Sequence, residues 1–445
     1  LLIIFTSLTA YSQDKSEVKY RRSSLHLMMM EDAKLPEKDI IINTFNNYPF
    51  PDKYNDHKID IVTIPNFLND DAEEAKKELK EQKKADKESD VKLSDEEKKR
   101  RKLIKDLRGA DKTIEKYFHD NKVANKIVAK WYNMQSNGVM NFDLVGDRGK
   151  YDATELDVKI AGKMSKSIAT QLQDAGTELI DKTFVIINKF KFIDNEIAAA
   201  IAYEISKGVL KGMPSESKIQ QTIKNAFEKK AKTLYEKMRK GYSVSTQAIL
   251  YQLDWSKEVQ NTFYNEHFMP EDYSATLNDS LRLQAMNSFL NSDIFQLKLI
   301  GMEKQMIAVM NLTSEDLSKQ QIIDEAIKRT MNKVYVKLQK EYDVFKPRMP
   351  LLSASKKDCT AKIGMKEGLE GGEKFEVLEQ MVDKDGLTIY KSKGTIKVDK
   401  KKLWDNQFYA ASPPSLEGDK EVILATGFKG CKKSFYRGML IKQLK

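Results

Sequence analysis

The densest group of side chains able to do chemistry lies between residues 143 and 157. It contains Asp143, Asp147, Arg148 and Asp152, with two glycines interspersed. A glycine-containing loop before a helix N-terminus can hold a ligand close to the backbone, and paired carboxylates can act as general acid and base. However, carboxylates in a first helical turn also stabilise the helix, and Arg148 could simply pair with a neighbouring aspartate. The segment is therefore a candidate ligand or partner site, with catalysis and plain helix stabilisation as alternatives.

Metal binding and nucleophilic catalysis leave no recognisable pattern in this chain. The four histidines are far apart in sequence, so no paired-histidine zinc motif is present; they are His26, His57, His119 and His267. No G-x-S-x-G segment occurs either, which argues against a serine hydrolase of that type. We therefore predict no metal site, no cofactor and no catalytic residue.

Two cysteines, Cys359 and Cys431, occur near the C-terminal end of the chain. Their separation fits no zinc-binding motif. In an oxidising compartment they could form a disulfide that joins the first strand of a C-terminal module to its last. Two free, buried thiols are the alternative.

The net charge of +10 is concentrated towards the C-terminal end, where residues 356–445 hold 19 basic and 13 acidic side chains. Three consecutive lysines, Lys400, Lys401 and Lys402, stand beside Trp404. A basic surface with an aromatic side chain could bind an anionic ligand such as an acidic glycan. A solvated lysine-rich surface explains the same residues without any ligand.

Composition and hydrophobic spacing divide the rest of the chain into regions. Residues 13–69 are predicted to be β-rich, with strands at 23–30 and 58–64. Residues 70–102 are mostly charged, which predicts either a solvent-exposed helix with many ion pairs or a mobile insertion. Residues 103–346 alternate helical and strand patterns, as in a layered α/β domain with helices packed on a sheet.

Apolar spacing gives the elements of this middle domain. In order, we predict a helix over 152–179, a strand over 183–192, helices over 197–210 and 218–238, a strand over 244–255, a hairpin with arms 295–300 and 305–310, and a long helix that Ser314 caps and that stops near Pro347 and Pro350. In the helix predicted over 218–238, the apolar residues Ile219, Ile223 and Phe227 recur at helical spacing. Such spacing normally marks the face of a helix that packs on a core.

Short strands and tight turns follow a proline-bounded stretch at 346–350. Between 355 and 445 they predict a small closed or nearly closed β-barrel. The expected fold class is therefore α+β multidomain: an N-terminal α+β region, a middle layered α/β domain and a C-terminal barrel.

Two parts of the chain resemble known families. Residues 362–369 and 372–378 are similar to the opening of the SH3-like barrel in the flagellar assembly protein T family. Residues 142–157 and 249–255 resemble an uncharacterised family of exported Gram-negative envelope proteins. The resemblance implies an SH3-like barrel and a scaffold or adaptor in the cell envelope, and it transfers no catalytic residue.

The first residues indicate export. Residues 1–12 are uncharged and apolar and end in small residues, which predicts a signal peptide without its beginning, cleaved after Ser12. A buried N-terminal strand is the alternative. No later segment reaches the length that a membrane helix needs, and an exported protein would not use its basic charge on nucleic acid. We predict a protein of the periplasm or of the periplasmic face of the outer membrane.

Three functions are compatible with these observations. The first is a non-catalytic scaffold or adaptor that binds envelope proteins. The second is a binding module for cell-wall glycan or another anionic ligand through the basic C-terminal module. The third is a hydrolase that uses the carboxylates near Asp147. The sequence leaves the partner, the ligand and the oligomeric state undetermined.

Overall fold

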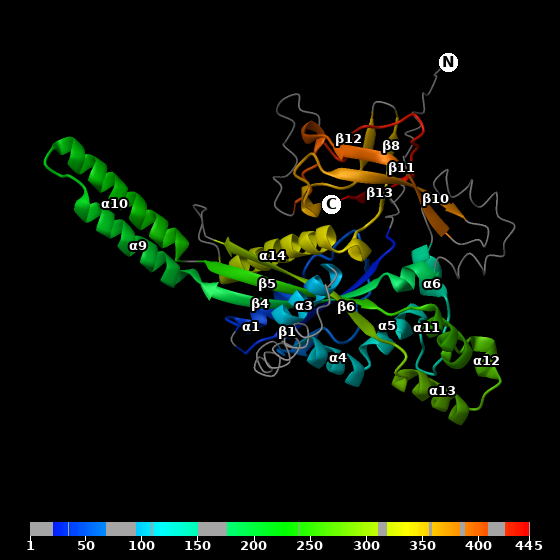
Figure 1. The fold of residues 1–445 in the computed structure, drawn as a ribbon. Coiled ribbons are helices and arrows are strands. Elements are labelled where there is room, and N and C mark those ends of the chain that lie inside the picture. The colour runs from blue at the N-terminus through cyan, green and yellow to red at the C-terminus, as the bar shows by residue number, and fades with distance from the viewer. Residues whose placement is uncertain are drawn as a thin grey trace, which may run out of the picture.

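A computed structural model describes residues 21–33, 35–67, 95–107, 110–149, 176–239, 241–309, 318–355, 358–382, 388–407 and 423–444. Several predictions lie outside these residues: the leader at 1–12, most of the charged insertion, and the helix over 152–179 apart from its last residues. Asp152 is outside them as well. The described part is a mixed α+β structure with two sheets, as predicted (Figure 1).

The larger sheet is built from strands of both the N-terminal and the middle regions. Its order is β2 (Asn55–Asp56), β1 (Ser24–Glu31), β4 (Thr183–Asp194), β5 (Tyr242–Leu253) and β6 (Leu297–Val309), and β3 (Thr63–Pro65) also pairs with β1. Strand β1 runs parallel to β2, β3 and β4, whereas β5 and β6 are antiparallel additions. Strands β1, β2 and β3 of the N-terminal region therefore share a sheet with strands of the middle region.

Helices cover both faces of this sheet. Helices α1 (Lys38–Asn46) and α14 (Lys319–Glu341) pack on one face together with Phe184 and Ile186. On the other face Val185 and Ile187 belong to a core that includes residues of seven further helices. These are α3 (Asp95–Leu107), α4 (Ala110–Asp120), α5 (Val123–Trp131), α6 (Asp143–Gly149), α11 (Lys257–Thr262), η1 (Phe263–His267) and α13 (Asp279–Asn291). The short helix α12 (Glu271–Ala275) lies between η1 and α13 in the chain and contributes no residue to this core. Alternate residues of β4 enter opposite cores, which explains its unbroken apolar run.

Three local predictions were wrong. The sequence pattern did not predict α1, and the strand expected over 58–64 is only β3. The hairpin expected at 295–310 is a single strand, β6, which runs straight through Gly301. A Cβ atom at Gly301 would lie 2.0 Å from the ring of Tyr342, so this glycine provides room for a tyrosine and makes no turn.

The second sheet lies in the C-terminal region and is curled and antiparallel. Its order is β7 (Met349–Pro350), β13 (Leu440–Gln443), β10 (Lys374–Val382), β11 (Thr388–Val398), β12 (Thr426–Lys429), β9 (Cys359–Ala361) and β8 (Ser353–Ala354). Short turns η3 (Met365–Glu367) and η4 (Lys400–Lys402) connect its strands, and η2 (Asp343–Phe345) links it to α14. Phe375, Val377 and Ile441 lie in its core.

A disulfide joins Cys359 and Cys431, whose Cα atoms are 6.1 Å apart. It links β9 to the loop that follows β12. Because β9 and β12 are neighbours in the sheet, the bridge ties adjacent strands, and the predicted connection from first strand to last was wrong.

A pair of antiparallel helices projects from the larger sheet, beyond the rest of the molecule (Figure 1). Helices α9 (Asn195–Gly212) and α10 (Lys218–Met238) form it, between the ends of β4 and β5. We call residues 195–239 the helical arm. Asp194 caps α9 by accepting a hydrogen bond from the backbone of Glu196, and Ser217 and Gln220 form a capping box on α10.

Candidate functional site

Arg148, the central residue of the predicted site, points into the body of the protein. Its Nη1 donates to the hydroxyl of Ser24 at 3.1 Å and to Nδ1 of His57 at 2.7 Å, and its Nη2 donates to the carbonyl of Asp56 at 2.6 Å. The guanidinium also lies over the ring of Trp131, 4.7 Å from its centre. These contacts join α6 to β1, β2 and α5, so Arg148 holds the fold together.

His57 is held neutral by the same contacts. A guanidinium can only donate, so Nδ1 of His57 accepts, and its Nε2 must carry the hydrogen donated to the carbonyl of Ile127 at 3.0 Å. Burial and the charge of Arg148 lower the pKa of His57 well below its ordinary value. A buried imidazole with both nitrogens occupied has no free atom for a metal or a proton transfer.

Two of the predicted carboxylates lie within the described residues. Asp143 and Asp147 lie on α6 and are exposed. The segment predicted to be a loop is thus a short helix, because Arg148 fixes it against the sheet. Asp152 lies outside the described residues. The sequence singled out Arg148 and left open whether it meets a ligand, a partner or a neighbouring aspartate. It did not indicate Ser24 and His57, because these partners are remote in the chain.

The predicted basic cluster is exposed on the second sheet. Lys400, Lys401 and Lys402 form the turn η4, and Lys402 pairs with Asp358 at 3.2 Å. Trp404 is half-buried, and its backbone N–H donates to the Thr426 hydroxyl at 3.1 Å. The lysines are therefore accessible to a ligand, whereas Trp404 packs partly against the second sheet.

A buried carboxylate that sequence analysis missed lies between the two sheets. Glu178 accepts hydrogen bonds from Lys182 at 2.5 Å, from Arg348 at 2.9 Å and from Tyr390 at 2.7 Å. Burial raises the pKa of Glu178, but the positive charge of Lys182 and these bonds outweigh it and lower the value to about 2. Arg348 also stacks on Tyr390. Glu178 is therefore ionised and fully occupied in joining the two sheets.

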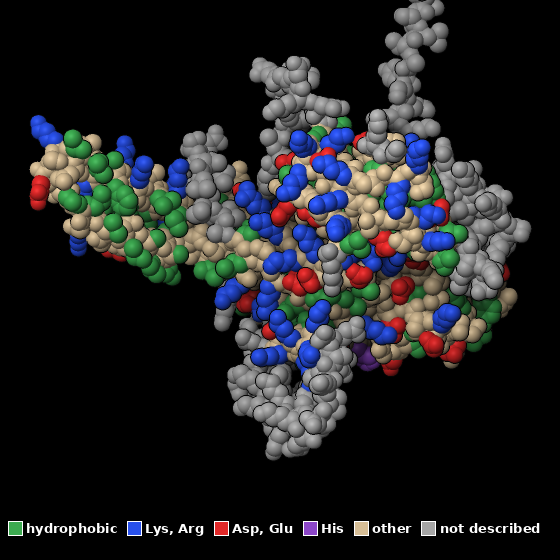
Figure 2. Space-filling view, turned by 45° about the horizontal axis from the view of Figure 1, so that its top comes forward, with side chains coloured by type: hydrophobic (Ala, Val, Ile, Leu, Met, Phe, Trp, Pro, Cys, Tyr) green, Lys and Arg blue, Asp and Glu red, His purple; other side chains and the backbone are tan. Residues whose placement is uncertain are grey.

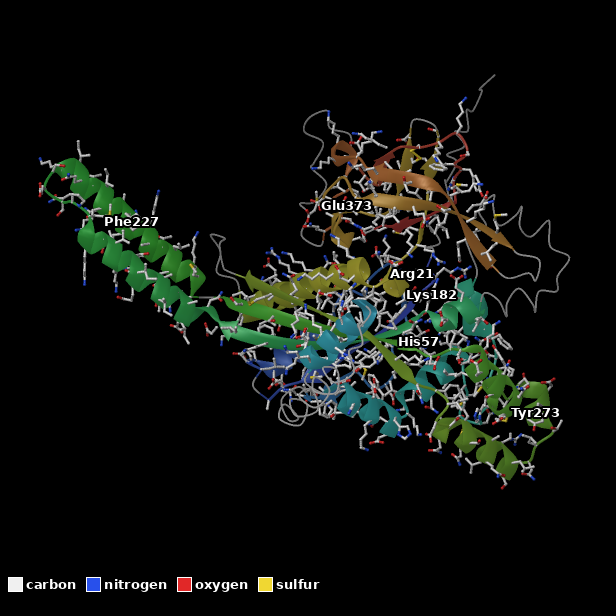
Figure 3. All side chains as sticks on the ribbon, viewed as in Figure 1. Arg21, His57, Lys182, Phe227, Tyr273 and Glu373 are labelled. Carbon is white, nitrogen blue, oxygen red and sulfur yellow. A yellow bond between two sulfur atoms is a disulfide. The ribbon has the colours of Figure 1, made fainter. Side chains whose placement is uncertain are left out.

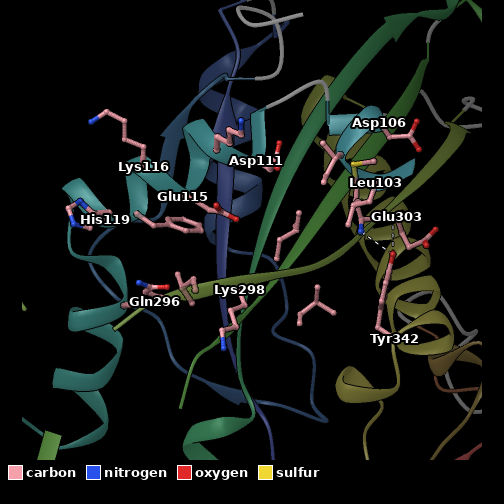
Figure 4. Close-up of a pocket in the computed structure, with 18 of the residues that line it drawn as sticks. Leu103, Asp106, Asp111, Glu115, Lys116, His119, Gln296, Lys298, Glu303 and Tyr342 are labelled. Atoms are coloured by element: carbon pink, nitrogen blue, oxygen red, sulfur yellow. Dashed lines mark hydrogen bonds between the residues drawn. The ribbon is translucent and has the colours of Figure 1, made fainter. Parts of the chain in front are cut away.

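A cavity of about 1650 Å³ lies between α3, α4 and the outer edge of β6 (Figure 4). Its walls carry charges of both signs, and some of them pair with each other, as Lys116 does with Asp120 at 2.7 Å. The hydroxyl of Tyr342 accepts from the backbone N–H of Met302 at 3.1 Å and so covers part of the strand edge. Within the described residues, no three side chains of the His, Cys, Asp or Glu type could hold a metal ion.

The helical arm carries a different kind of site, an exposed apolar surface. Its large apolar side chains are between 39% and 74% exposed, and α10 has no buried residue; they are Ile197, Ile201, Ile205, Val209, Ile219, Ile223, Phe227 and Leu234. Figure 2 shows hydrophobic side chains gathered over both helices of the arm. Phe227 lies far from His57 and Lys182 in the body (Figure 3). The prediction that this helix face packs on a core was wrong.

The two helices of the arm contact each other through other residues. Ala199 and Leu210 of α9 are buried, and the rings of Tyr203 and Tyr235 stack 4.9 Å apart. The isoleucines are thus left to solvent. Their helical spacing was visible in the sequence, but the spacing alone does not say whether the chain itself provides a covering surface.

No protein-family model matches the sequence, and no curated protein is detectably similar to it. Among the helices that the structure describes, none is both long enough and apolar enough to span a membrane. A function for this chain is therefore inferred from the structure of its described residues.

Proposed function

We propose that this protein is a non-catalytic scaffold or adaptor of a Gram-negative cell envelope. The observation that carries the proposal is the exposed apolar surface of the helical arm. Contiguous apolar surface of this kind is typical of interaction sites, because water contact with large aliphatic side chains is unfavourable. In contrast, Arg148 and Glu178, the described charged groups with the most elaborate contacts, bind other parts of the same chain.

Two observations support the exported location. The uncharged apolar segment at 1–12 has the composition of a signal peptide. The disulfide between Cys359 and Cys431 is typical of proteins that mature in an oxidising compartment. The curled sheet that contains this bridge is compatible with an SH3-like barrel, which we propose as a second contact module.

Crosslinking in intact cells, followed by purification under gentle conditions and mass spectrometry, tests the scaffold function. We expect envelope proteins to crosslink reproducibly to the intact chain. The scaffold function would be refuted if the chain is recovered in full yield as a monomer and no other protein is crosslinked to it.

A second candidate function is binding of cell-wall glycan through the turn η4. It is supported by the exposure of Lys400, Lys401 and Lys402 on one turn. Purified sacculi should retain the wild-type protein, and a variant with all three lysines changed to Glu should be released at a lower salt concentration. Exposed Lys211, Lys218 and Lys229 on the helical arm, changed to Glu together, provide a matched control. Equal retention of the wild type and the η4 variant removes this candidate.

A further inference from the structure

The helical arm cannot cover its own apolar residues. Its internal contacts use small and aromatic side chains such as Ala199 and Tyr203, while Ile201, Ile205 and Ile223 are more than half exposed. A helix of about 20 residues gains most of its stability in proteins from packing of its apolar face. The arm therefore needs an external surface that accepts aliphatic side chains along its length.

The charge of the arm indicates which charge the surface that covers it carries. Residues 195–239 contain nine basic and five acidic side chains, and all but one of the basic residues are lysines. In α10 alone, six lysines stand against two glutamates. An amphipathic helix with an apolar line and a lysine-rich remainder fits an anionic surface.

The shape of the arm also bears on the kind of surface that contacts its apolar side chains. The arm extends away from both sheets, so none of the other helices and strands that the structure describes stands beside its outer half (Figure 1). Its apolar side chains stand on two helices, each about 27 to 31 Å long by the rise of an α-helix. A fluid acyl layer accepts aliphatic groups of any shape, and the long stems of lysines reach from it to the headgroups.

We infer that the helical arm lies in the interface of a membrane that contains anionic lipids, with its isoleucines among the acyl chains and its lysines at the headgroups. This inference rests on the proposed function, because it names the surface that the arm contacts in the envelope. The arm rests on the membrane and does not cross it.

The charge of the arm disfavours the main alternative occupant, a second copy of the chain. Two copies that met through their arms would bring two surfaces with an excess of lysine together, which costs free energy. An anionic lipid surface is stabilised by the same charges, because each lysine near the surface is attracted to the headgroups. The same electrostatic attraction makes binding sensitive to salt.

Sedimentation with lipid vesicles tests the inference. The purified wild-type chain is mixed with vesicles of phosphatidylcholine alone or with added phosphatidylglycerol, at low and high salt. We expect binding to the anionic vesicles only, weakened by salt. Changing Ile219, Ile223 and Phe227 to Gln should reduce the vesicle affinity by about tenfold or more, because each side chain loses its apolar burial.

Two further variants separate apolar from electrostatic contributions. Changing Lys229, Lys230 and Lys232 to Gln should also reduce binding to anionic vesicles by about tenfold or more. The matched control changes the exposed Tyr273, Leu281 and Leu283 of α12 and α13 to Gln and should bind like the wild type. Circular dichroism of each variant reports whether the arm remains helical.

Several outcomes would overturn the inference. One is a wild-type chain that does not sediment with anionic vesicles. Another is equal binding of the arm variant and the control. A third is a wild-type dimer that the Ile219, Ile223 and Phe227 substitutions convert to a monomer without any vesicle binding, which would make the arm a contact between copies. Crosslinked envelope proteins in cells would still support the scaffold function in each of these cases.

Discussion

At the scale of single residues, the side chains that look chemically capable are used for structure. Arg148 gives its hydrogen bonds to Ser24, His57 and the backbone of Asp56, and Glu178 gives its acceptors to Lys182 and Arg348. Both charges are partly buried. Groups that are distant in the chain satisfy Arg148, whereas Glu178 is satisfied by nearby Lys182 and by distant Arg348 and Tyr390. Removing one member leaves a buried polar group without a partner, which is costly.

Changing Arg148 to Met should therefore destabilise the protein. The methionine side chain is shorter and uncharged and leaves Nδ1 of His57 and the carbonyl of Asp56 without their donor, so we expect a loss of about 3 kcal/mol in the free energy of unfolding. Urea denaturation measures it. Asp143→Asn, an exposed change on the same short helix, should stay within about 0.5 kcal/mol. Equal effects of the two changes would show that the Arg148 contacts do not stabilise the fold.

Buried His26 makes stability depend on pH. Its Nε2 donates to the carbonyl of Ile61 at 2.8 Å, and its Nδ1 faces the N–H of Ile59 at 3.4 Å. Burial lowers the pKa of His26 from 6.5 to about 4, although the Ile61 carbonyl opposes the shift. The unfolded chain thus takes up a proton below pH 6.5, whereas the folded chain does so only near pH 4.

The free energy of unfolding should consequently fall as the pH drops from 6.5 to 4, by roughly 3 kcal/mol from His26. Urea denaturation at a series of pH values measures the slope. Substituting Gln at position 26 removes one titrating group and should make the slope in this window shallower, even if the variant is less stable at pH 7. The slope that remains comes from other groups such as His57, whose pKa is also lowered. A variant with the same slope as the wild type would show that another group causes it.

At the scale of elements, the sequence predicted the helices and strands that have a clear local pattern of apolar residues. Strands such as β1 and β4 have β-branched or apolar runs, and α14 has a clear apolar line over Ile323 and Ile327, so their existence followed from the sequence. Helix α1 was missed because it is short and only moderately apolar. The turn expected near Gly301 was wrong because the glycine is required by Tyr342, which is remote in the chain.

The disulfide is the element-scale feature that is simplest to test. It closes a loop with a sequence separation of 72 residues, for which the chain-entropy model gives about 4 kcal/mol of stabilisation. Adding a reductant should lower the melting temperature of the second sheet, and replacing Cys359 and Cys431 by Ser should abolish the response to reductant. No change on reduction would mean that the two thiols are free.

At the scale of the whole molecule, stability and interaction are located in different parts. The body contains the buried cores on both faces of the larger sheet and the core of the second sheet. The helical arm adds exposed apolar residues but no buried residue on α10. Sequence periodicity predicted both arm helices, but only the three-dimensional arrangement shows that no other described element covers them.

The body should fold without the arm. Asp194 and Tyr242 are paired across β4 and β5, so a two-residue Asn-Gly turn can join the strands in place of residues 195–241. Comparing this shortened chain with the wild type in one experiment tests the central claim most directly. Its free energy of unfolding and its association with the isolated envelope fraction are both measured. We predict an unfolding free energy within about 1 kcal/mol of the wild-type value and loss of envelope association. A shortened chain that still associates fully with the envelope, or that no longer folds, would contradict the account.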